Sequence, residues 1–447
     1  MTKKKIKMKP KNFILELIKQ QVKPALGCTE IGIVALAAAK AAKMLPNRFA
    51  SANVKISTCI YRNDIRVGVP KLGICGISTI AAAGFILKNP EKKLSCIDDL
   101  NSKNIPLVKK LGSSKKITIK IDYNAESVYT YVEAMDIKRN VAKVLIAGAH
   151  DHIVSAKLNG KETIKSSNKK SAISSDINFD EHVNDMSLEQ VYNYIKKMTM
   201  SDLKFLDANI KMNNKICNFG LKHFERGSLT ETLLKADKAK NKHCGFLKSQ
   251  WINKVILHTC AGVEARMYGN NYPVMTSANS GDHGLTVSIP LSVYAKINKI
   301  SNLKLFQALL FAHYVTWYIK SHVGHLCGMC GCAVAAAPGA VCGIAYQLGW
   351  SWKKINDLLN AHLCSQLGIM CDGAKPSCAY KCINAILNGY LALTIVEHNG
   401  KVLSKDGVVY KDVDKTIKNY KFISRKTLKS LADTAVQMLD NMQKLHD

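Results

Sequence analysis

The sequence predicts an α+β protein, with a mixed α/β N-terminal half and a mainly α-helical C-terminal half. Three observations lead to this class. Alanine-rich apolar segments at helical spacing come first, alternating apolar and polar residues typical of strands fill residues 116–164, and nearly everything beyond residue 187 has helical spacing. A chain of 447 residues is also too long for one small core. We place the halves at residues 1–165 and 187–447, joined by a polar linker or insertion over residues 166–186.

The first half is expected to begin with two helices. Residues 13–27 carry apolar side chains at helical spacing and stop near Pro24 and Gly27, and the alanine-rich residues 31–45 end at Pro46. Residues 52–62 alternate like a strand, and residues 66–87 pass from a Gly/Pro turn into another alanine-rich helix. Three alternating segments, residues 116–123, 127–137 and 141–164, predict the strands of a sheet.

The second half opens with a capping box, because Ser187 and Gln190 stand three apart before an apolar helical run. Residues 305–319 form the longest apolar stretch, but it contains Gln and His and is bounded by Lys304 and Lys320, so it predicts a buried helix. No segment has the roughly 18 uninterrupted apolar residues of a membrane span. We therefore expect no membrane partner.

The charge is strongly basic, with 64 Lys plus Arg against 33 Asp plus Glu and a formal net charge of +31. Such an excess favours anionic partners such as nucleic acid. It is spread along the chain, however, which favours a lysine-rich solvated surface, and no recognition-helix motif or aromatic ladder accompanies it. Specific nucleic-acid binding is therefore not expected. Fifteen cysteines, an odd number, and a basic start without signal-peptide features predict a reducing, cytoplasmic location.

Two short glycine-rich segments concentrate the cysteines: "CGMCGC" at residues 327–332 and "CDGAKPSC" at residues 371–378. A structural zinc site would normally show two C-x-x-C pairs, whereas the second segment here is C-x₆-C. An iron–sulfur cluster held by one thiolate of the first segment and two of the second fits better, although spacing alone leaves zinc or buried thiols open. Isolated cysteines are expected to be buried apolar residues: Cys96, Cys217, Cys244, Cys342 and Cys382.

Three segments in order, "VKPALGCTE" (residues 22–30), "CGCAVAAAPGA" (330–340) and "GIMCDGAKPSCAYK" (368–381), resemble the L-cysteine desulfidase family, the UPF0597 proteins similar to the alpha chain of iron–sulfur serine dehydratases. Further likeness runs through "RNDIRVGVPKLG", "HDHIV" and "SANSGDHGLTVSIP". The resemblance implies a [4Fe-4S] enzyme of the lyase class that eliminates from a small L-amino acid. Both halves are then expected to form one catalytic unit, and a homo-oligomer stays open.

The resemblance also implies roles for individual residues. Cys371 and Cys378 match two cluster ligands, and the third is Cys330 or Cys332, with Cys330 preferred. Cys28 matches the base that removes the substrate α-proton, and its place before an alanine-rich helix would favour its thiolate.

Other residues are candidates for contact with the substrate. Lys375, Asp372 and His283 are expected to bind it, and His150 and His152 are further candidate polar contacts. The chain departs from the family pattern at four positions that leave every proposed thiolate in place: Ile31, Cys59, Asp282 and Trp350.

The favoured activity is conversion of L-cysteine to pyruvate, ammonia and hydrogen sulfide. The alternatives are an L-serine dehydratase giving pyruvate and ammonia, or a non-catalytic iron–sulfur or redox sensor that binds nucleic acid. An open iron would act as a Lewis acid on the leaving group in the catalytic cases.

Overall fold

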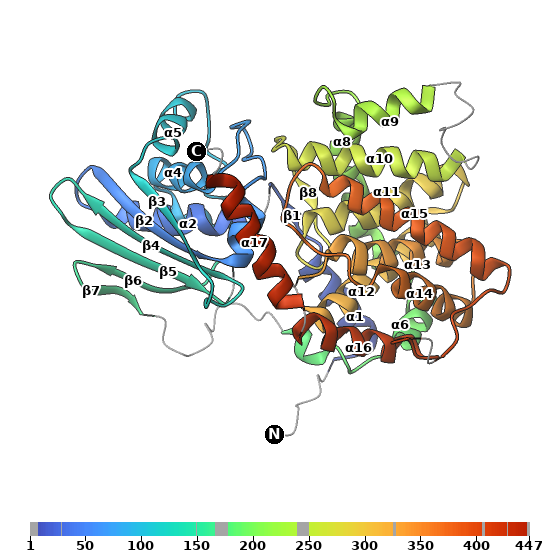
Figure 1. The fold of residues 1–447 in the computed structure, drawn as a ribbon. Helices are drawn as coiled ribbons and strands as arrows, with labels where there is room; N and C mark the ends of the chain where they lie inside the picture. Colours follow the sequence, from blue (N-terminus) through green and yellow to red (C-terminus); the bar gives the residue numbers. More distant parts are fainter. Residues whose placement is uncertain are drawn as a thin grey trace, which may run out of the picture.

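The computed structural model describes residues 8–27, 29–148, 150–165, 178–238, 250–324, 328–404, 407–426 and 428–444. It confirms the predicted fold class. A six-stranded sheet with helices on it forms one side of the molecule, and a bundle of helices forms the other (Figure 1). The predicted linker lies mostly outside the described residues, and its last part carries a short 3₁₀ turn, Phe179–His182, whose Phe179 ring meets Phe13 at 5.2 Å between centroids.

The sheet has the order β3-β2-β4-β5-β6-β7. Only β2 and β3 run parallel, and the other neighbours are antiparallel. The strands are β2 (Phe49–Ser57), β3 (Ile117–Asp122), β4 (Tyr129–Asp136), β5 (Val141–Ala147), β6 (Ile153–Leu158) and β7 (Lys161–Lys165). Consecutive strands joined by short turns pair in this way because hairpins connect antiparallel neighbours.

Alanine-rich helices cover this sheet. Helix α2 (Thr29–Met44) packs on β4 and β5, and α4 (Ile77–Leu87) packs closely against α2. Their small side chains allow the two helix axes to approach, and most are fully buried. Helix α5 (Ile105–Gly112) lies beside α4. The predicted helices at residues 31–45 and 66–87 are thus confirmed, the second over its C-terminal part.

One expectation for this half is wrong. Residues 52–62 were expected to form a single strand, but β2 ends at Ser57, and Thr58–Asp64 form helix α3. The Ser57 hydroxyl accepts a hydrogen bond from the Ile60 amide at 3.3 Å and so caps the helix. The alternation of apolar residues continues past this cap, which is why it suggested a longer strand. The change brings Cys59, Arg62 and Asn63 onto a helix.

The second half is helical, as expected, and the capping box at Ser187 and Gln190 is present. Its helices are α6 (Leu188–Ile195), α7 (Met200–Leu203), α8 (Asp207–Gly220), α9 (Leu229–Lys238), α10 (Gln250–Met267), α11 (Gly281–Ile297), α12 (Asn302–Val323), α13 (Ala337–Gln347), α14 (Trp352–Gln366), α15 (Cys378–Glu397) and α16 (Val413–Lys426). Helix α12 contains the predicted apolar stretch and is buried along almost its whole length. Within the described ranges, only α15 is long and apolar enough to span a membrane by length and composition, and half of that stretch is buried inside the protein.

The terminal helices cross between the halves. Helix α1 (Pro10–Gln21) packs with α6 and α12 of the helical half, and α17 (Leu428–Lys444) returns to pack on α3. In Figure 1 the red α17 runs back to the blue part of the chain. A short antiparallel pair, β1 (Pro24–Ala25) with β8 (Val274–Met275), joins the halves again. The N-terminal helix therefore packs on the helical side, and the C-terminal helix packs on the sheet side.

Candidate active site

The two cysteine-rich segments lie side by side. The Cys330 amide donates to the Ile369 carbonyl and the Cys371 amide donates to the Gly328 carbonyl, both at 2.8 Å, and Met329 and Met370 form an antiparallel bridge. These backbone bonds hold the loop before α13 against the loop before α15. They explain how thiols some forty residues apart reach one place.

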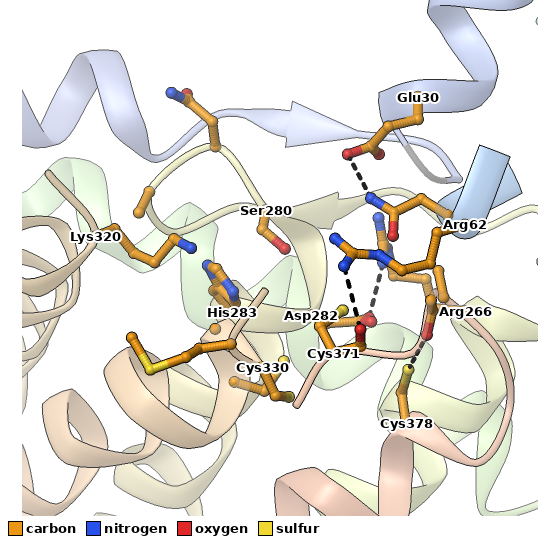
Figure 2. A pocket seen from close by; sticks show the side chains of 18 of the residues that line it. Glu30, Arg62, Arg266, Ser280, Asp282, His283, Lys320, Cys330, Cys371 and Cys378 are labelled. Carbon is orange, nitrogen blue, oxygen red and sulfur yellow. Dashed lines mark hydrogen bonds and ion pairs between the residues drawn. The ribbon is translucent and has the colours of Figure 1, made fainter. Parts of the chain in front are cut away.

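All four candidate ligand thiols line one cavity of about 140 Å³ (Figure 2). The cavity lies where the two halves meet, because Glu30, Arg62, Asn63 and His150 come from the sheet half and the other lining residues from the helical half. The helical half contributes Arg266, Ala278, Asn279, Ser280, Asp282, His283, Lys320, Met329, Cys330, Gly331, Cys332, Cys371, Gly373, Ala374 and Cys378. Charged side chains therefore surround the thiols.

The first thiol segment continues into a π-helical turn, Cys332–Ala336, before α13. Such turns are rare and occur frequently at functional sites. A hydrogen bond between the Cys330 and Cys332 thiols, together with burial, raises the pKa of Cys330 well above its usual range. Cys382, expected to be a plain buried residue, is buried, and its thiol contacts that of Cys332. The Cys332 thiol is therefore in contact with the thiols of both Cys330 and Cys382.

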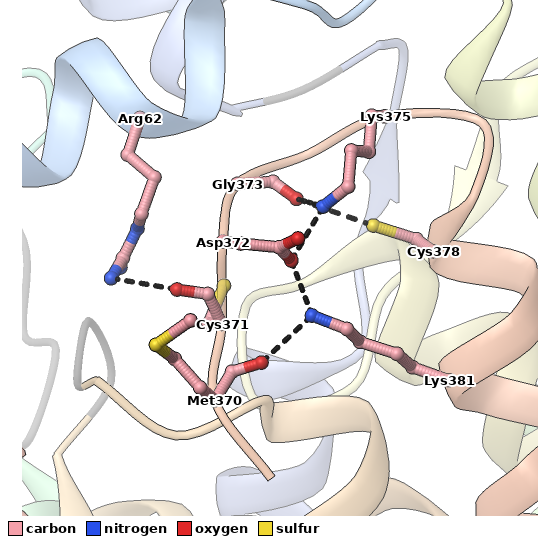
Figure 3. A network of polar contacts seen from close by, with 8 residues as sticks. All are labelled: Arg62, Met370, Cys371, Asp372, Gly373, Lys375, Cys378 and Lys381. Atoms are coloured by element: carbon pink, nitrogen blue, oxygen red, sulfur yellow. Dashed lines mark hydrogen bonds and ion pairs between the residues drawn. The ribbon is translucent and has the colours of Figure 1, made fainter. Parts of the chain in front are cut away.

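The second thiol segment is held by a network of polar contacts around Asp372 (Figure 3). Lys375 Nζ lies 2.5 Å from Asp372 Oδ1, and Lys381 Nζ pairs with the same oxygen and also donates to the Met370 carbonyl at 2.8 Å. Burial acts to raise the pKa of Asp372, but the hydrogen bonds from the two lysines outweigh it and lower the pKa. The carboxylate therefore stays charged and fixes the loop.

The same loop is pressed against α3. Gly373 has φ of +102°, and a Cβ at this position would lie 2.1 Å from the Arg62 carbonyl oxygen, so only glycine fits without rearrangement. Arg62 Nη1 donates to the Cys371 carbonyl at 3.2 Å. Burial raises the pKa of Cys378 to about 12, with a further contribution from Asp282. A thiol of this kind needs a metal or another cation to become a thiolate.

Arg266 and Asp282 form a buried ion pair beside the thiols. Arg266 Nη1 lies 2.7 Å from Asp282 Oδ1, and Nη2 donates to the Gly27 carbonyl at 2.6 Å. Asp282, one of the four positions expected to depart from the family pattern, therefore helps to fix the chain just before α2. The other three are not lining residues. Ile31 lies in the core of the sheet half, Cys59 lies on α3 near the lining residues Arg62 and Cys371, and Trp350 lies in the helical half.

The structure brings together most of the predicted site residues. Cys330, Cys332, Cys371, Cys378 and His283 line the cavity. Asp372 and Lys375 are absent from its lining and pair with each other, so their predicted contact with substrate stays a prediction. His150 also lines the cavity, whereas His152 is not among the lining residues and its Nδ1 lies 3.2 Å from the Ala147 carbonyl oxygen. Cys28 lies outside the described residues, and its role stays a prediction, although Gly27 and Glu30 on either side of it contact or line the site.

The sequence did not predict that Lys381 pairs with Asp372. It also did not predict four residues of the cavity lining: Glu30, Arg62, Arg266 and Lys320. Lys320 and Lys381 carried a signal, since Lys320 interrupts a long apolar run and Lys381 belongs to the quoted "CDGAKPSCAYK" motif. Arg62 begins the quoted "RNDIRVGVPKLG" segment and so carried the same kind of signal, whereas Arg266 carried none. Both reach the site only through tertiary packing.

Comparison with known proteins shows the family to which the chain belongs. Residues 102–439 match the family model described as serine dehydratase alpha chain. A UPF0597 protein of Alkaliphilus oremlandii (strain OhILAs) is 31% identical over 98% of this chain and 100% of its own length. UPF0597 proteins of Clostridium perfringens (strain SM101 / Type A) and Clostridium botulinum (strain Langeland / NCTC 10281 / Type F) are 30% and 32% identical, covering 96% and 91% of this chain and 98% and 92% of their own lengths. The chain belongs to the serine dehydratase alpha chain family and, within it, to the UPF0597 proteins.

Proposed function

We propose that this protein is a lyase that carries out β-elimination from a small L-amino acid, with L-cysteine as the favoured substrate. The products would be hydrogen sulfide and 2-aminoacrylate, which tautomerises and is hydrolysed by water to pyruvate and ammonia. The observation that carries the proposal is the meeting of four cysteines with charged side chains of both halves in one small cavity. Membership of the serine dehydratase alpha chain family supports the reaction class.

The donor set fits a [4Fe-4S] cluster. Cys371, Cys378 and one of Cys330 and Cys332 would hold it. Each thiolate of a cuboidal cluster binds a different iron atom, so the sulfur atoms need not converge as the ligands of a single ion do. The assignment rests on the two cysteine segments and on the family match, since no three His, Cys, Asp or Glu side chains of the described residues are grouped so that they could hold a metal ion. When bound, a cluster with three protein thiolates supplies an open iron that acts as a Lewis acid on the leaving group.

Side chains of the protein would supply the base and hold the cavity in place. We propose Cys28 as the base that removes the α-proton, on the strength of its match to the family motif. Arg266 holds the carbonyl of Gly27 directly before it. The Arg266–Asp282 pair and the Arg62 contact with Cys371 keep the walls of the cavity fixed while charge moves, which is how an organised polar site lowers a barrier.

L-Serine is the second candidate substrate, and the description of the matching family model favours it. The two amino acids differ only in the leaving group, which departs through sulfur in L-cysteine and through oxygen in L-serine. Comparing kcat/KM for L-cysteine and L-serine on the same preparation decides between them. A higher value for serine would replace the desulfidase proposal with a dehydratase.

Anaerobically purified protein provides the test of the whole proposal. We expect iron and acid-labile sulfide near four of each per chain and release of pyruvate from L-cysteine. Zinc without labile sulfide would overturn the cluster assignment. Cluster-loaded protein that released no pyruvate from either amino acid would overturn the lyase assignment.

A further inference from the structure

We infer that a second cavity, which adjoins the cavity of Figure 2 (the thiol cavity), is an entry site where a small zwitterionic amino acid binds before it reaches the thiols. This entry cavity has a volume of about 330 Å³ and lies between the end of α1 and the 3₁₀ turn Phe179–His182. Its polar lining consists of four amide side chains and two charged ones: Gln20, Gln21, Asn178, Asn279, Lys23 and Asp180. That the entering amino acid is the substrate rests on the proposed function.

Asn279 connects the two cavities. It lines both of them, and among the described residues it is the one that the two linings share. Asn279 is also exposed, whereas its neighbour Ala278, which lines the thiol cavity, is buried. The entry cavity opens to solvent as well, because its lining residues Lys23 and Asn178 are exposed. A path from solvent to the thiols therefore leads through the entry cavity and past Asn279.

The backbone at this junction is held firmly. Ala278 and Asn279 have left-handed φ values of +44° and +61°, and the amides of Ser277 and Ser280 each donate to the other residue's carbonyl at 3.0 Å. Asparagine tolerates this conformation better than most residues, whereas for alanine it is strained and is retained only where the surroundings require it. His313 of α12 anchors the turn, with Nδ1 2.9 Å from Ser277 Oγ. The backbone of Asn279 is thus fixed, and its side chain sets the width of the passage.

The charges of the entry cavity suit a zwitterion. Asp180 Oδ1 accepts hydrogen bonds from Trp317 Nε1 at 2.9 Å and from the Ser321 hydroxyl at 2.5 Å, so this carboxylate is fixed in place. The Lys23 amide donates to the Thr276 hydroxyl at 3.0 Å, which fixes the backbone that bears the ammonium group. An amino acid can direct its ammonium toward Asp180 and its carboxylate toward Lys23, while the amide side chains donate and accept further hydrogen bonds.

The two volumes favour a small ligand. The entry cavity measures about 330 Å³ and the thiol cavity about 140 Å³, so a molecule that moves inward passes into the smaller space. A large amino acid is therefore expected to be stopped at Asn279.

Alkylation of Cys371 by iodoacetamide tests the path, because this partly exposed thiol lines the thiol cavity. Full-length protein purified anaerobically without iron is labelled, and the modified peptides are measured by mass spectrometry. Asn178→Trp fills the entry cavity from its outer side and should slow the labelling of Cys371 about tenfold, because a narrowed passage limits access. Asn279→Gly removes a side chain without straining the left-handed backbone and should speed the labelling about threefold. The exposed thiols of Cys75 and Cys364 are internal references and should react at wild-type rates.

A matched control and a second blocking variant complete this test. Asn271 is exposed on the connection between α10 and β8 and lines neither cavity, so Asn271→Trp should be labelled like the wild type. Lys23→Trp narrows the entry cavity from another side and covers the case in which Asn178→Trp does not fold. Wild-type labelling of Cys371 in the folded tryptophan variants that narrow the entry cavity would overturn the path.

Protection by L-alanine tests the class of ligand, because this amino acid has both charges but no leaving group. L-Alanine should slow the labelling of Cys371. Its half-protecting concentration should rise about tenfold in Asp180→Asn, as expected for loss of one charge-assisted contact. Ethylamine and acetate, which each carry one of the charges, should protect less.

Two results would overturn the amino-acid site: no protection by L-alanine in the wild type, or an unchanged half-protecting concentration in Asp180→Asn. Pyruvate release from L-cysteine or L-serine is measured separately on cluster-loaded protein. Protection that depends on Asp180, in a protein that releases no pyruvate, would keep the entry site and reject only the elimination reaction.

Discussion

At the scale of single residues, the cysteines divide according to their surroundings. Cys342 is fully buried within α13, and burial raises the pKa of its thiol well above the usual range. Cys371 and Cys378 are only partly covered and lie at the cavity. The same residue type is therefore inert packing in one place and a candidate ligand in another, and the difference lies in the neighbouring groups.

The ligand assignment predicts a clear separation between variants. Cys371→Ser and Cys378→Ser should each lose most of their iron and the associated visible absorbance, because a serine oxygen is a poor replacement for a thiolate ligand. Cys342→Ser should keep its iron and lose only stability. Iron analysis and absorbance of anaerobic preparations provide the measurement. Equal iron content in all three would contradict the assignment, and separate Cys330→Ser and Cys332→Ser variants identify the third ligand.

Cys28→Ser is predicted to lower kcat without changing folding or the iron content. The variant should fold, keep full iron and sulfide, and lose about 10²- to 10⁴-fold in kcat, the usual contribution of a general base. Steady-state pyruvate release with parallel iron analysis measures this. Loss of iron would instead make Cys28 a ligand, and a wild-type kcat would exclude both roles.

At the scale of elements, the loop between Cys371 and Cys378 is organised before any ligand binds. Asp372 forms ion pairs with both Lys375 and Lys381. Gly373 permits close contact with α3, and backbone hydrogen bonds join the loop to the first thiol segment. The charge of Lys381 also faces Cys330 and Cys371. Such supporting groups fix ligand geometry and partly neutralise the thiolates.

Lys381→Met is therefore predicted to weaken cluster retention about tenfold or more, in the range observed for groups that support metal ligands. Iron loss during timed incubation with a chelator measures the effect. Lys375→Met should lose iron more slowly than Lys381→Met, because Lys375 reaches Gly373 and not the Met370 carbonyl. Identical chelation rates for Lys381→Met and wild type would show that the loop keeps its geometry without this contact.

The turn between β4 and β5 predicts a pH effect on stability. Burial acts to raise the pKa of Asp136, but hydrogen bonds from Asn47 and Asn140 outweigh it and lower the pKa to about 2. An unfolded aspartate titrates near about 3.9, so the stabilisation is present above about pH 4 and is lost as the pH falls toward 2. Urea midpoints of wild type and Asp136→Asn should differ at pH 6 and converge toward pH 3. A constant difference would contradict this.

At the scale of the whole molecule, the cavity depends on both halves being correctly joined. Helix α3 brings Arg62 to the cysteine loop, and α17 from the C-terminus packs on α3, where the Tyr61 hydroxyl donates to Asp440 at 3.2 Å. Helix α1 makes the opposite crossing and buries Phe13 and Leu17 in the helical half. Folding of each half thus relies on an element from the other end of the chain.

Residues 1–177 expressed alone should therefore be unstable, because α1 would expose its apolar face and α3 would lose its cover. We expect poor dispersion in an amide NMR spectrum and binding of a hydrophobic dye. The full chain, prepared in parallel, should show neither. A well-dispersed spectrum from the fragment would mean that the sheet half folds independently of the terminal helices.

Local pattern alone determined the fold class, the capping box at Ser187, the buried helix around residues 305–319 and the two thiol segments, because periodicity, capping and motif spacing are properties of neighbouring residues. It failed at residues 58–62, where a serine cap turned an alternating run into α3. The tertiary structure alone decided that α1 and α17 exchange sides and that Arg62, Arg266 and Lys320 meet at the thiols. These meetings join residues up to several hundred positions apart, and long-range packing, which no local pattern encodes, selects them.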